Sequence, residues 1–561
     1  MRKLSLLGAL VIGITPATFG AMCDVSGSPE SVAKQPNFIF IQGEGRGWSS
    51  ASVAMDPSMP GAKQPDGLSP NLEKLAKGGM TFSEFYATSP RCTPSRASYV
   101  TGISPAKLHM TYVNSRGEEA DGGDRKQRED RPGQRATQPR EGGGGAGGTG
   151  KGGGGGRRGT EGQPASGDAR PQMLRMMVPQ TEMDLPPGVK TTADWLKPLG
   201  YASAHYGKWH VSRKDPKQNG FDDSDGPNTN AGPNRNVKPN PEEGISITDR
   251  GIAFMEAQIK AGKPFYLQID HYGTGGEEEV TPEALEIARK IVPDARAKTL
   301  ASAAGTVDMD MQIGRILDAL DRLGIADHTY IMFSTDHGNP GGQGNRPTDG
   351  NAPLQRGKGS IYEGGVRVPF IVKGPGIKAG SHSKVRATGM DLVPTILDLA
   401  GQPIIVNAAK RDDRTSVEGG SLKAVLTGDG TSEVKRSRDE IVIHFPHYDL
   451  GNGGPATSIY SKNFKFIRID ETGDRFLFDM TTDPQEGRNL IMSEPELAKE
   501  LEKKLDEYLD AIKAQRATPA KNGPAPGTQP STAPAEETRK PRGEKPARND
   551  RPASDREKEP K

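Results

Sequence analysis

The segment Asn37-Phe38-Ile39-Phe40-Ile41 is a short, continuous apolar run, and glycines follow it at positions 43, 45 and 47. An apolar run without polar alternation is typical of a strand that is buried on both faces, as in a parallel sheet. The glycines indicate a tight loop directly after this strand. Glu44 therefore lies at the carboxyl end of a predicted central strand, which is where ligand groups collect in parallel sheets.

A helix follows this strand. Ser69-Pro70 supplies a capping residue and a proline suited to the first turn, and Gly78-Gly79 ends the segment. These signals predict a helix over residues 71–77.

The same order of helix and strand returns later in the chain. Apolar residues between Val307 and Leu323 recur at a spacing close to 3.6, and Gly324 then ends this predicted helix. The apolar strand Tyr330-Ile331-Met332-Phe333 follows and leads into Asp336-His337-Gly338. This alternation predicts an α/β fold with a large, mostly parallel central sheet and helices on both faces.

The pattern changes after about residue 430. Short apolar runs at 441–443, 464–467 and 475–478 are separated by turn residues, which predicts a small antiparallel sheet. The amphipathic segment 494–512 predicts a helix that packs on this sheet.

These patterns divide the chain into segments. We expect a signal peptide over 1–21, a catalytic α/β domain over 22–430, a small C-terminal subdomain over 431–515 and a disordered tail over 516–561. A Gly/Arg-rich insertion at 114–170 is also predicted to be disordered.

Composition narrows the class of protein. The chain has 561 residues, a net charge of +2 and only two cysteines, Cys23 and Cys92. This length predicts more than one domain, and two cysteines exclude a disulfide framework. The basic Gly/Arg tracts carry no interleaved aromatic residues, so no nucleic-acid partner is expected.

The N-terminus has the pattern of an export signal. Arg2 and Lys3 precede the apolar run 4–14, and small residues that suit cleavage follow around position 20. The run is too short for stable insertion across a membrane. We expect a periplasmic or extracellular protein, with a lipid anchor at Cys23 as the alternative.

Cys92 lies in an unusual context, Cys92-Thr93-Pro94-Ser95-Arg96, which continues to Thr101-Gly102. Pro94 suits the first turn of a helix, so Cys92 is expected at a helix N-terminus. Free backbone N–H groups and the helix dipole favour an anion there. A thiolate nucleophile is the simplest interpretation of this pattern.

The C-x-P-S-R and T-G pattern resembles the signature of the formylglycine-dependent sulfatase family. Further segments of the chain are similar to sulfatase motifs in the same order. They are Gly207-Lys208-Trp209-His210, Gly220-Phe221-Asp222, Thr335-Asp336-His337-Gly338, Gly357-Lys358-Gly359-Ser360, Tyr362-Glu363-Gly364-Gly365-Val366-Arg367-Val368-Pro369, Asp391-Leu392-Val393-Pro394-Thr395 and Asp483-Pro484 through Asn489-Leu490. The resemblance covers most of residues 36–490.

The resemblance implies an alkaline-phosphatase-like fold and hydrolysis of sulfate esters, on sulfated carbohydrates or aryl sulfates. A maturation enzyme would oxidise Cys92 to formylglycine, whose hydrate attacks sulfur to give a sulfo-enzyme intermediate. Arg96 resembles the arginine that holds this hydrate, and Lys208 and Lys358 resemble the sulfate-binding lysines. His210 resembles the histidine that releases sulfate by accepting a proton.

The resemblance also implies a divalent cation. Glu44, Cys92, Asp336 and His337 match the family's ligand positions, and a ligand set rich in oxygen favours Ca²⁺ over Mg²⁺. The family usually has two adjacent aspartates after the first strand, whereas this chain has Glu44-Gly45. One carboxylate is therefore missing, so weaker metal binding or a different ligand is expected.

A second departure concerns the acid that assists the leaving group. The family's histidine position falls on Gly275, and His271 lies four residues earlier. His271 is either a substitute for this acid or a structural histidine. His444 and His447 could also reach the site, but packing roles are expected for them.

Two other functions remain open from the sequence. Relatives in the same superfamily hydrolyse phosphonate monoesters or phosphodiesters with the same modified cysteine. A degenerate protein that binds sulfated glycans without turnover would also fit the missing aspartate and histidine. The joint presence of Cys92, Arg96, Lys208, His210 and Lys358 favours an enzyme.

Overall fold

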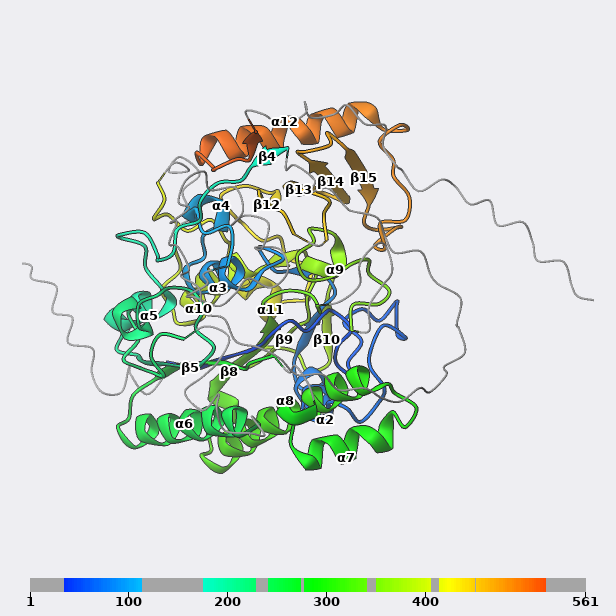
Figure 1. Ribbon diagram of the computed structural model, residues 1–561. Coiled ribbons are helices and arrows are strands. Elements are labelled where there is room, and N and C mark those ends of the chain that lie inside the picture. The colour runs from blue at the N-terminus through cyan, green and yellow to red at the C-terminus, as the bar shows by residue number, and fades with distance from the viewer. Residues whose placement is uncertain are drawn as a thin grey trace, which may run out of the picture.

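The computed structural model describes residues 35–113, 175–228, 241–273, 277–340, 350–404, 413–449 and 451–520. The predicted signal peptide, Cys23, the 114–170 insertion and Gly275 lie outside these residues. The described chain forms one large sheet between two layers of helices, with a smaller sheet and helix α12 above it (Figure 1).

The large sheet contains eight strands in the order β10-β2-β9-β8-β1-β7-β5-β6. Its strands are β1 (Asn37–Gly43), β2 (Met80–Phe82), β5 (Ala202–Gly207), β6 (Asp223–Ser224), β7 (Phe265–Asp270), β8 (Thr329–Thr335), β9 (Phe370–Lys373) and β10 (Ser381–Ser383). Strands β6, β5, β7, β1 and β8 run parallel, and β9 is antiparallel to both of its neighbours. The predicted α/β fold with a mostly parallel sheet is confirmed.

Strand β1 shows why the first apolar run has no polar alternation. Phe38 and Phe40 face one hydrophobic core, and Ile39 and Ile41 face a second core on the opposite side of the sheet. All of these side chains are at most 2% exposed. Because successive side chains of a strand point to opposite faces, burial on both faces requires a continuous apolar run.

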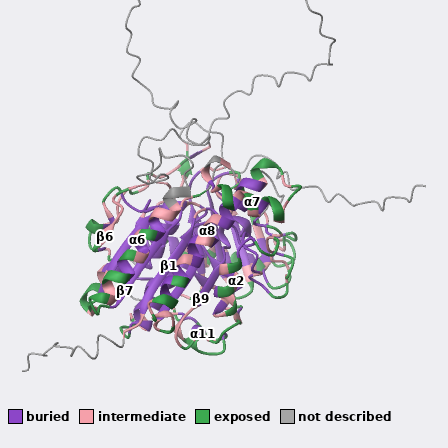
Figure 2. Cartoon of the chain, turned by 90° about the horizontal axis from the view of Figure 1, so that it is seen from below, coloured by how far each residue is buried: buried purple, intermediate pink, exposed green. Residues whose placement is uncertain are grey.

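Helices cover both faces of the sheet (Figure 1). Seen from the side of α2, α6 and α8, the strands β1, β7 and β9 are buried (Figure 2). One layer contains α2 (Pro70–Lys77), α6 (Pro241–Lys260), α7 (Pro282–Ile291) and α8 (Ala297–Arg322). The other contains α3 (Cys92–Thr101), α4 (Pro105–Leu108), α5 (Thr192–Leu196) and α10 (Leu392–Leu399). Two short helices, α9 (Glu363–Val366) and α11 (Lys423–Thr427), complete this domain.

Helix α2 forms where its sequence signals predict, but its cap is different. The side chain of Ser69 makes no capping bond and instead accepts a bond from the backbone N–H of Ser52 at 2.8 Å. The N–H groups of Asn71 and Leu72 donate to the carboxylate of Asp310 at 3.0 and 2.8 Å. A carboxylate from α8 therefore satisfies this helix end.

Asp310→Ala should lower the free energy of unfolding by about 1–2 kcal/mol, because two N–H groups at the start of α2 lose their acceptor. Asp318 lies on the same helix and is exposed, so Asp318→Ala is the matched control. Denaturant unfolding of both variants measures the difference. Equal stability of the two variants would contradict the capping role of Asp310.

The C-terminal subdomain is the predicted antiparallel sheet with a helix. Its strands are β12 (Ile441–Phe445), β13 (Ala456–Ser461), β14 (Phe464–Ile469) and β15 (Arg475–Asp479), in sequence order. Helix α12 (Pro495–Ala511) packs Leu501 and Leu505 against this sheet. The sequence did not predict β13, whose polar residues hide the strand pattern.

The predicted start of the tail at residue 516 needs a correction. Arg516 donates to Asp506 of α12 at 2.9 Å. Strand β16 (Thr518–Pro519) then pairs with β4 (Met176–Met177). These contacts hold the chain in place beyond the point where its composition turns polar.

A further two-stranded pairing joins β3 (Phe85–Tyr86) to β11 (Ala387–Thr388).

Within the described ranges, every helix is too short or too polar to cross a lipid bilayer.

Candidate active site

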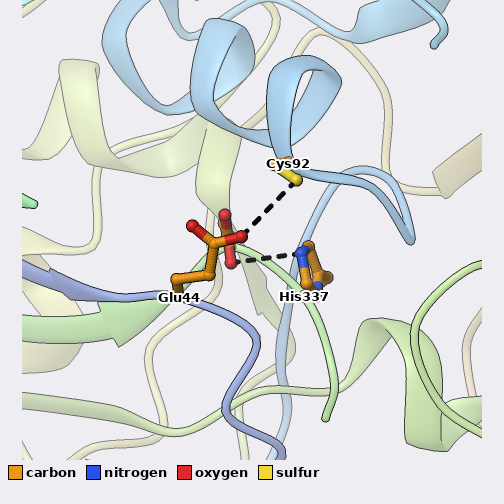
Figure 3. Close-up of side chains that lie close together, drawn as sticks. Glu44, Cys92 and His337 are labelled. Carbon is orange, nitrogen blue, oxygen red and sulfur yellow. Dashed lines mark hydrogen bonds and ion pairs between the residues drawn. The ribbon is translucent and has the colours of Figure 1, made fainter. Parts of the chain in front are cut away.

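Three elements of the fold bring four predicted ligand residues together. Glu44 follows β1, Asp336 and His337 follow the neighbouring parallel strand β8, and Cys92 is the first residue of α3. One ligand atom from each residue lies within 4.8 Å of the others. Figure 3 shows Glu44 pointing toward Cys92, with its Oε1 3.9 Å from Sγ. The site therefore forms at the carboxyl ends of the strands, as predicted.

Cys92 occupies a helix start that favours an anion. The residue is 3% exposed, and all ten residues of α3 are buried. Burial alone would raise the pKa of the Cys92 thiol, but the charges of Lys208 and Lys358 outweigh burial and hold this pKa well below its usual value. A negative charge at position 92 is therefore stabilised by its surroundings.

Arg96 lies one turn further along α3 and is completely enclosed. Its Nε donates to Oδ2 of Asp336 at 2.8 Å, and its Nη1 donates to the carbonyl oxygen of Lys208 at 2.6 Å. Its Nη2 is 3.8 Å from Oε2 of Glu44. The guanidinium group thus ties the start of α3 to the loops after β1, β5 and β8.

Two lysines complete the positive charge around Cys92. Lys208 follows β5, is fully buried, and forms an ion pair with Oε2 of Glu44. Lys358 Nζ is 4.0 Å from Oε1 of Glu44 and is partly exposed. Burial tends to lower the pKa of Lys358, but the opposite charges of Cys92 and Glu44 raise it overall. Both lysines are therefore placed to bind an anionic group beside Cys92.

The loop that carries Lys358 is held close to the site by backbone contacts. The N–H of Lys358 donates to Asn339 at 3.2 Å, and the N–H of Gly359 donates to Pro90 at 3.0 Å. A Cβ atom on Gly338 would lie 1.8 Å from the carbonyl oxygen of Gly364. Only glycine permits this approach between the loop after β8 and the Tyr362–Val366 signature.

His337 has the geometry of a metal ligand. Its Nδ1 donates to the carbonyl oxygen of Gly338 at 2.8 Å, which leaves Nε2 as the ring nitrogen that can bind a metal. Nε2 is buried without a hydrogen-bond partner among the described residues. Oδ1 of Asp336 lies 3.5 Å from this nitrogen. These donors fit a divalent cation.

Gly45 has a different role from the aspartate that the resemblance places there. Its φ is +57°, and its N–H donates to Oδ1 of Asp336 at 2.9 Å. A Cβ atom at this position would lie 3.1 Å from Cε1 of His337. The tight loop after β1 thus supplies a backbone N–H to the site in place of a second carboxylate.

His210 lies where the resemblance places the proton acceptor. It is 3% exposed, adopts the left-handed conformation with φ +46°, and interacts with Cys92. Its N–H donates to the carbonyl oxygen of Asn228 at 3.0 Å. The unusual backbone turn directs His210 to Cys92 from the loop after β5.

His271 is the predicted substitute for the leaving-group acid, and it is buried. Burial and the charge of Arg46 lower the pKa of His271 to about 4, so its imidazole is neutral near pH 7. A neutral imidazole is a weak acid, which argues against the substitute role for His271. Gly275 itself lies outside the described residues.

His444 and His447 are structural. His444 lies 2.7 Å from Oγ1 of Thr457 on the adjacent strand, and His447 lies 2.8 Å from Oγ1 of Thr111. Both are buried in these contacts, as expected for packing residues.

The sequence patterns missed Asp270 and His205. Asp270 ends β7, is 1% exposed, and accepts a bond from Nη1 of Arg96 at 3.1 Å. His205 Nε2 lies 3.0 Å from the same carboxylate. An aspartate at the end of the strand-like stretch 265–269 was the available signal, because it ends a parallel strand.

Comparison with known proteins settles the family. The sulfatase family profile matches residues 36–130 and 157–402, which is more than half of the chain. The chain belongs to the sulfatase family. A second profile, N-sulphoglucosamine sulphohydrolase C-terminal, matches residues 357–515 and covers the small subdomain of this sulfatase.

Curated relatives are also sulfatases. The chain is 26% identical over 404 residues to N-acetylgalactosamine-6-sulfatase of Mus musculus, with 65% of this chain and 62% of that protein covered. It is 23% identical over 527 residues to an ulvan-active sulfatase of Formosa agariphila, with 86% and 83% covered. The chain therefore spans less than two thirds of the mouse relative.

Solved structures support the fold of this sulfatase. Ps i-CgsB in complex with k-i-k-neocarrahexaose superposes with a TM-score of 0.60 at 18% identity, covering 85% of this chain and 93% of that one. A putative sulfatase, yidJ, from Bacteroides fragilis superposes with a TM-score of 0.57 at 17% identity, covering 88% and 98%.

Proposed function

We propose that this sulfatase hydrolyses sulfate esters of carbohydrates, with formylglycine made from Cys92 as its nucleophile and Ca²⁺ as its metal. The observation that carries the proposal is the placement of Cys92 at a buried helix start between Lys208 and Lys358. Sulfate is an anion, and its ester oxygen gains negative charge as the S–O bond breaks. Fixed cations in a buried site stabilise that charge more than water does.

Each side chain then has a role that follows from its place. Lys208 and Lys358 bind the sulfate oxygens beside position 92. Arg96 holds the nucleophilic residue, because its guanidinium group is fixed between Asp336 and the backbone of Lys208. His210 accepts a proton from residue 92, because its side chain interacts with that residue. Oxidation of Cys92 supplies a hydrated aldehyde, whose oxygen is the attacking atom.

Four donors support a cation at this site: Glu44, residue 92, Asp336 and Nε2 of His337. The ion would polarise the sulfate and lower the pKa of the nucleophile. Conversion of Cys92 replaces a soft sulfur ligand with a hard oxygen, which favours Ca²⁺ and leaves Mg²⁺ second. Gly45 provides no side-chain ligand, so we expect weaker retention of the ion.

Chelation provides a test of this metal site. Incubation with EDTA should remove most of the sulfatase activity, and Ca²⁺ should restore more of it than Mg²⁺ because the donors are mainly oxygen. Calcium affinity of His337→Ala, measured by calorimetry, should fall relative to the parent protein. Full activity in EDTA with no bound metal by elemental analysis would contradict the metal site.

Sulfated sugars are the proposed substrates. One structural neighbour contains D-Glucosamine-2-N, 6-O-disulfate, described as its substrate, and superposes with a TM-score of 0.53. The ulvan-active sulfatase among the relatives points the same way. Export through the N-terminal signal and processing by a maturation enzyme belong to this proposal, since an extracellular location would expose the enzyme to sulfated polysaccharides.

The experiment is a direct comparison of esters. Protein made together with a formylglycine-generating enzyme is assayed against sulfated mono- and oligosaccharides, an aryl sulfate, a phosphodiester and a phosphonate monoester. The proposal predicts release of inorganic sulfate at the highest kcat/KM. Faster hydrolysis of the phosphodiester or the phosphonate monoester would contradict the proposal and indicate a phosphorus-ester hydrolase. Binding of sulfated glycans without release of sulfate would indicate a non-catalytic protein.

A further inference from the structure

Asp270 is a buried carboxylate that makes contact with two parts of the site. Its Oδ2 accepts from Nη1 of Arg96 at 3.1 Å, and its backbone oxygen accepts from the N–H of Lys208 at 2.8 Å. Arg96 in turn donates to the carbonyl oxygen of Lys208 at 2.6 Å. Asp270, Arg96 and Lys208 therefore form a closed set of contacts.

His205 and Gln268 hold the Asp270 carboxylate in place. Nε2 of each residue lies 3.0 Å from Oδ2 of Asp270. His205 is paired with Gln268 across strands β5 and β7, so these side chains share one face of the sheet with Asp270. Tyr266, also on this face, donates to Oε1 of Gln268 at 2.9 Å and fixes its orientation.

The ring of His205 is itself fixed by aromatic neighbours. It meets Trp209 edge-on at 4.9 Å and Phe221 at 5.7 Å between ring centroids. Its side chain is 1% exposed. A histidine that contacts a carboxylate from within an aromatic pocket has little freedom to rotate, which limits the movement of Asp270 as well.

The backbones of strands β5 and β7 are in close contact at their carboxyl ends. Gly207 has φ +94°, and a Cβ atom at this position would lie 2.0 Å from the carbonyl oxygen of Asp270. Glycine at position 207 permits this close approach, and the next residue, Lys208, donates its N–H to the same carbonyl oxygen. Any displacement of Asp270 would therefore move the start of the loop that carries Lys208 and His210.

Asp270 also compensates the positive charge of the buried Arg96 side chain. Three carboxylates, from Glu44, Asp270 and Asp336, lie within 3.8 Å of the guanidinium group. Gly45 provides none, although the family usually has an aspartate there. A buried guanidinium group needs compensating charge and hydrogen-bond acceptors. Asp270 supplies both from a different strand.

We propose that Asp270 and His205 form a positioning pair that fixes Arg96 and the Lys208 loop for the reaction at residue 92. Asp270 acts through its contacts to Arg96 and Lys208, and His205 acts through Asp270. The inference rests on the proposed function because Arg96 holds residue 92 and Lys208 binds the sulfate there. Misplacement of such groups by about 1 Å can cost on the order of 10²-fold in rate.

Steady-state kinetics of three variants test the pair, at a temperature where each is fully folded. Asp270→Ala should lower kcat by roughly 10²-fold, and Asp270→Asn by less because it keeps an acceptor for Arg96. His205→Phe keeps a ring among the aromatic neighbours and should lower kcat by roughly tenfold or less. In each variant KM should change by no more than about twofold.

Coupling and a control separate positioning from general destabilisation. His205→Phe should cost no further activity in the Asp270→Ala background, because its partner is already gone. Asp223 begins strand β6 of the same sheet and accepts a bond from the hydroxyl of Tyr206 at 2.7 Å, so Asp223→Asn should keep kcat within about twofold. A folded Asp270→Ala with kcat near that of the parent, or a loss entirely in KM, would overturn the pair.

A crystal structure of Asp270→Ala tests the positioning pair without any measurement of activity. The guanidinium group of Arg96 should leave the carbonyl oxygen of Lys208. An unmoved Arg96 would overturn the inference. If the converted parent protein released no sulfate, the proposed function would fail, and this crystallographic result would still decide the inference. Should Asp270→Ala not fold, the Asp270→Asn kinetics and structure apply the same criteria.

Discussion

Cys92→Ala is expected to lower the rate of sulfate-ester hydrolysis by on the order of 10⁴-fold or more, because the nucleophilic oxygen is lost. The substitution removes a small side chain at the start of α3, so the helix and its buried surroundings should remain. Turnover is measured on purified protein with the best ester from the substrate comparison. Thermal unfolding of the same sample confirms that the fold is intact.

The chain offers a matched control for this substitution. Cys23 is the only other cysteine, and Cys23→Ala should leave turnover unchanged in protein produced without the signal segment. Loss of activity in both variants would point to a general effect of cysteine replacement. Retention of activity in Cys92→Ala would contradict the role of residue 92 as the nucleophile.

Lys208→Met is expected to lower kcat/KM by roughly 10²–10³-fold, because a fixed cation next to the developing negative charge is lost. The substitution also removes one of the three cations that lie beside the carboxylate of Glu44. Methionine has a similar length, so the buried space remains filled. Steady-state kinetics on a sulfate ester measure the loss.

Lys214 provides the matched control for Lys208. It lies on an exposed part of the loop after β5, so Lys214→Met should change kcat/KM by less than about twofold. An equal loss of kcat/KM in both variants would mean that the overall positive charge of the protein, rather than direct contact of Lys208 with the sulfate, assists the reaction. Unchanged kinetics in Lys208→Met would remove Lys208 from the sulfate site.

The long periodic elements of this fold could be predicted from the sequence. Strands β1 and β8 are continuous apolar runs, and the apolar spacing of α8 and α12 is clear. The observed α8 begins at Ala297, ten residues before the apolar spacing that starts at Val307, because small residues pack there without a strong apolar pattern. Strand β13 carries polar residues at positions 457, 458 and 461 and was missed, since its burial depends on the neighbouring strands.

The residues of the candidate site also fall into two groups, those indicated by sequence motifs and those recognised only in the folded structure. Cys92, Arg96, Lys208, His210 and Lys358 lie in glycine- and proline-marked segments with fixed spacing, so their sequence context identified them. Asp270 and His205 have no such context, and their contact depends on pairing between β5 and β7. The capping of α2 by Asp310 is also a contact between distant segments. Such contacts become visible only when the chain is folded.

The central claim is that residue 92 of the active protein is formylglycine. Mass spectrometry of the peptide that contains residues 92–96, from protein made with a formylglycine-generating enzyme, tests it most directly. The account predicts loss of the thiol and gain of an aldehyde that reacts with a hydrazide probe. A fully retained thiol in protein that still hydrolyses sulfate esters would contradict it.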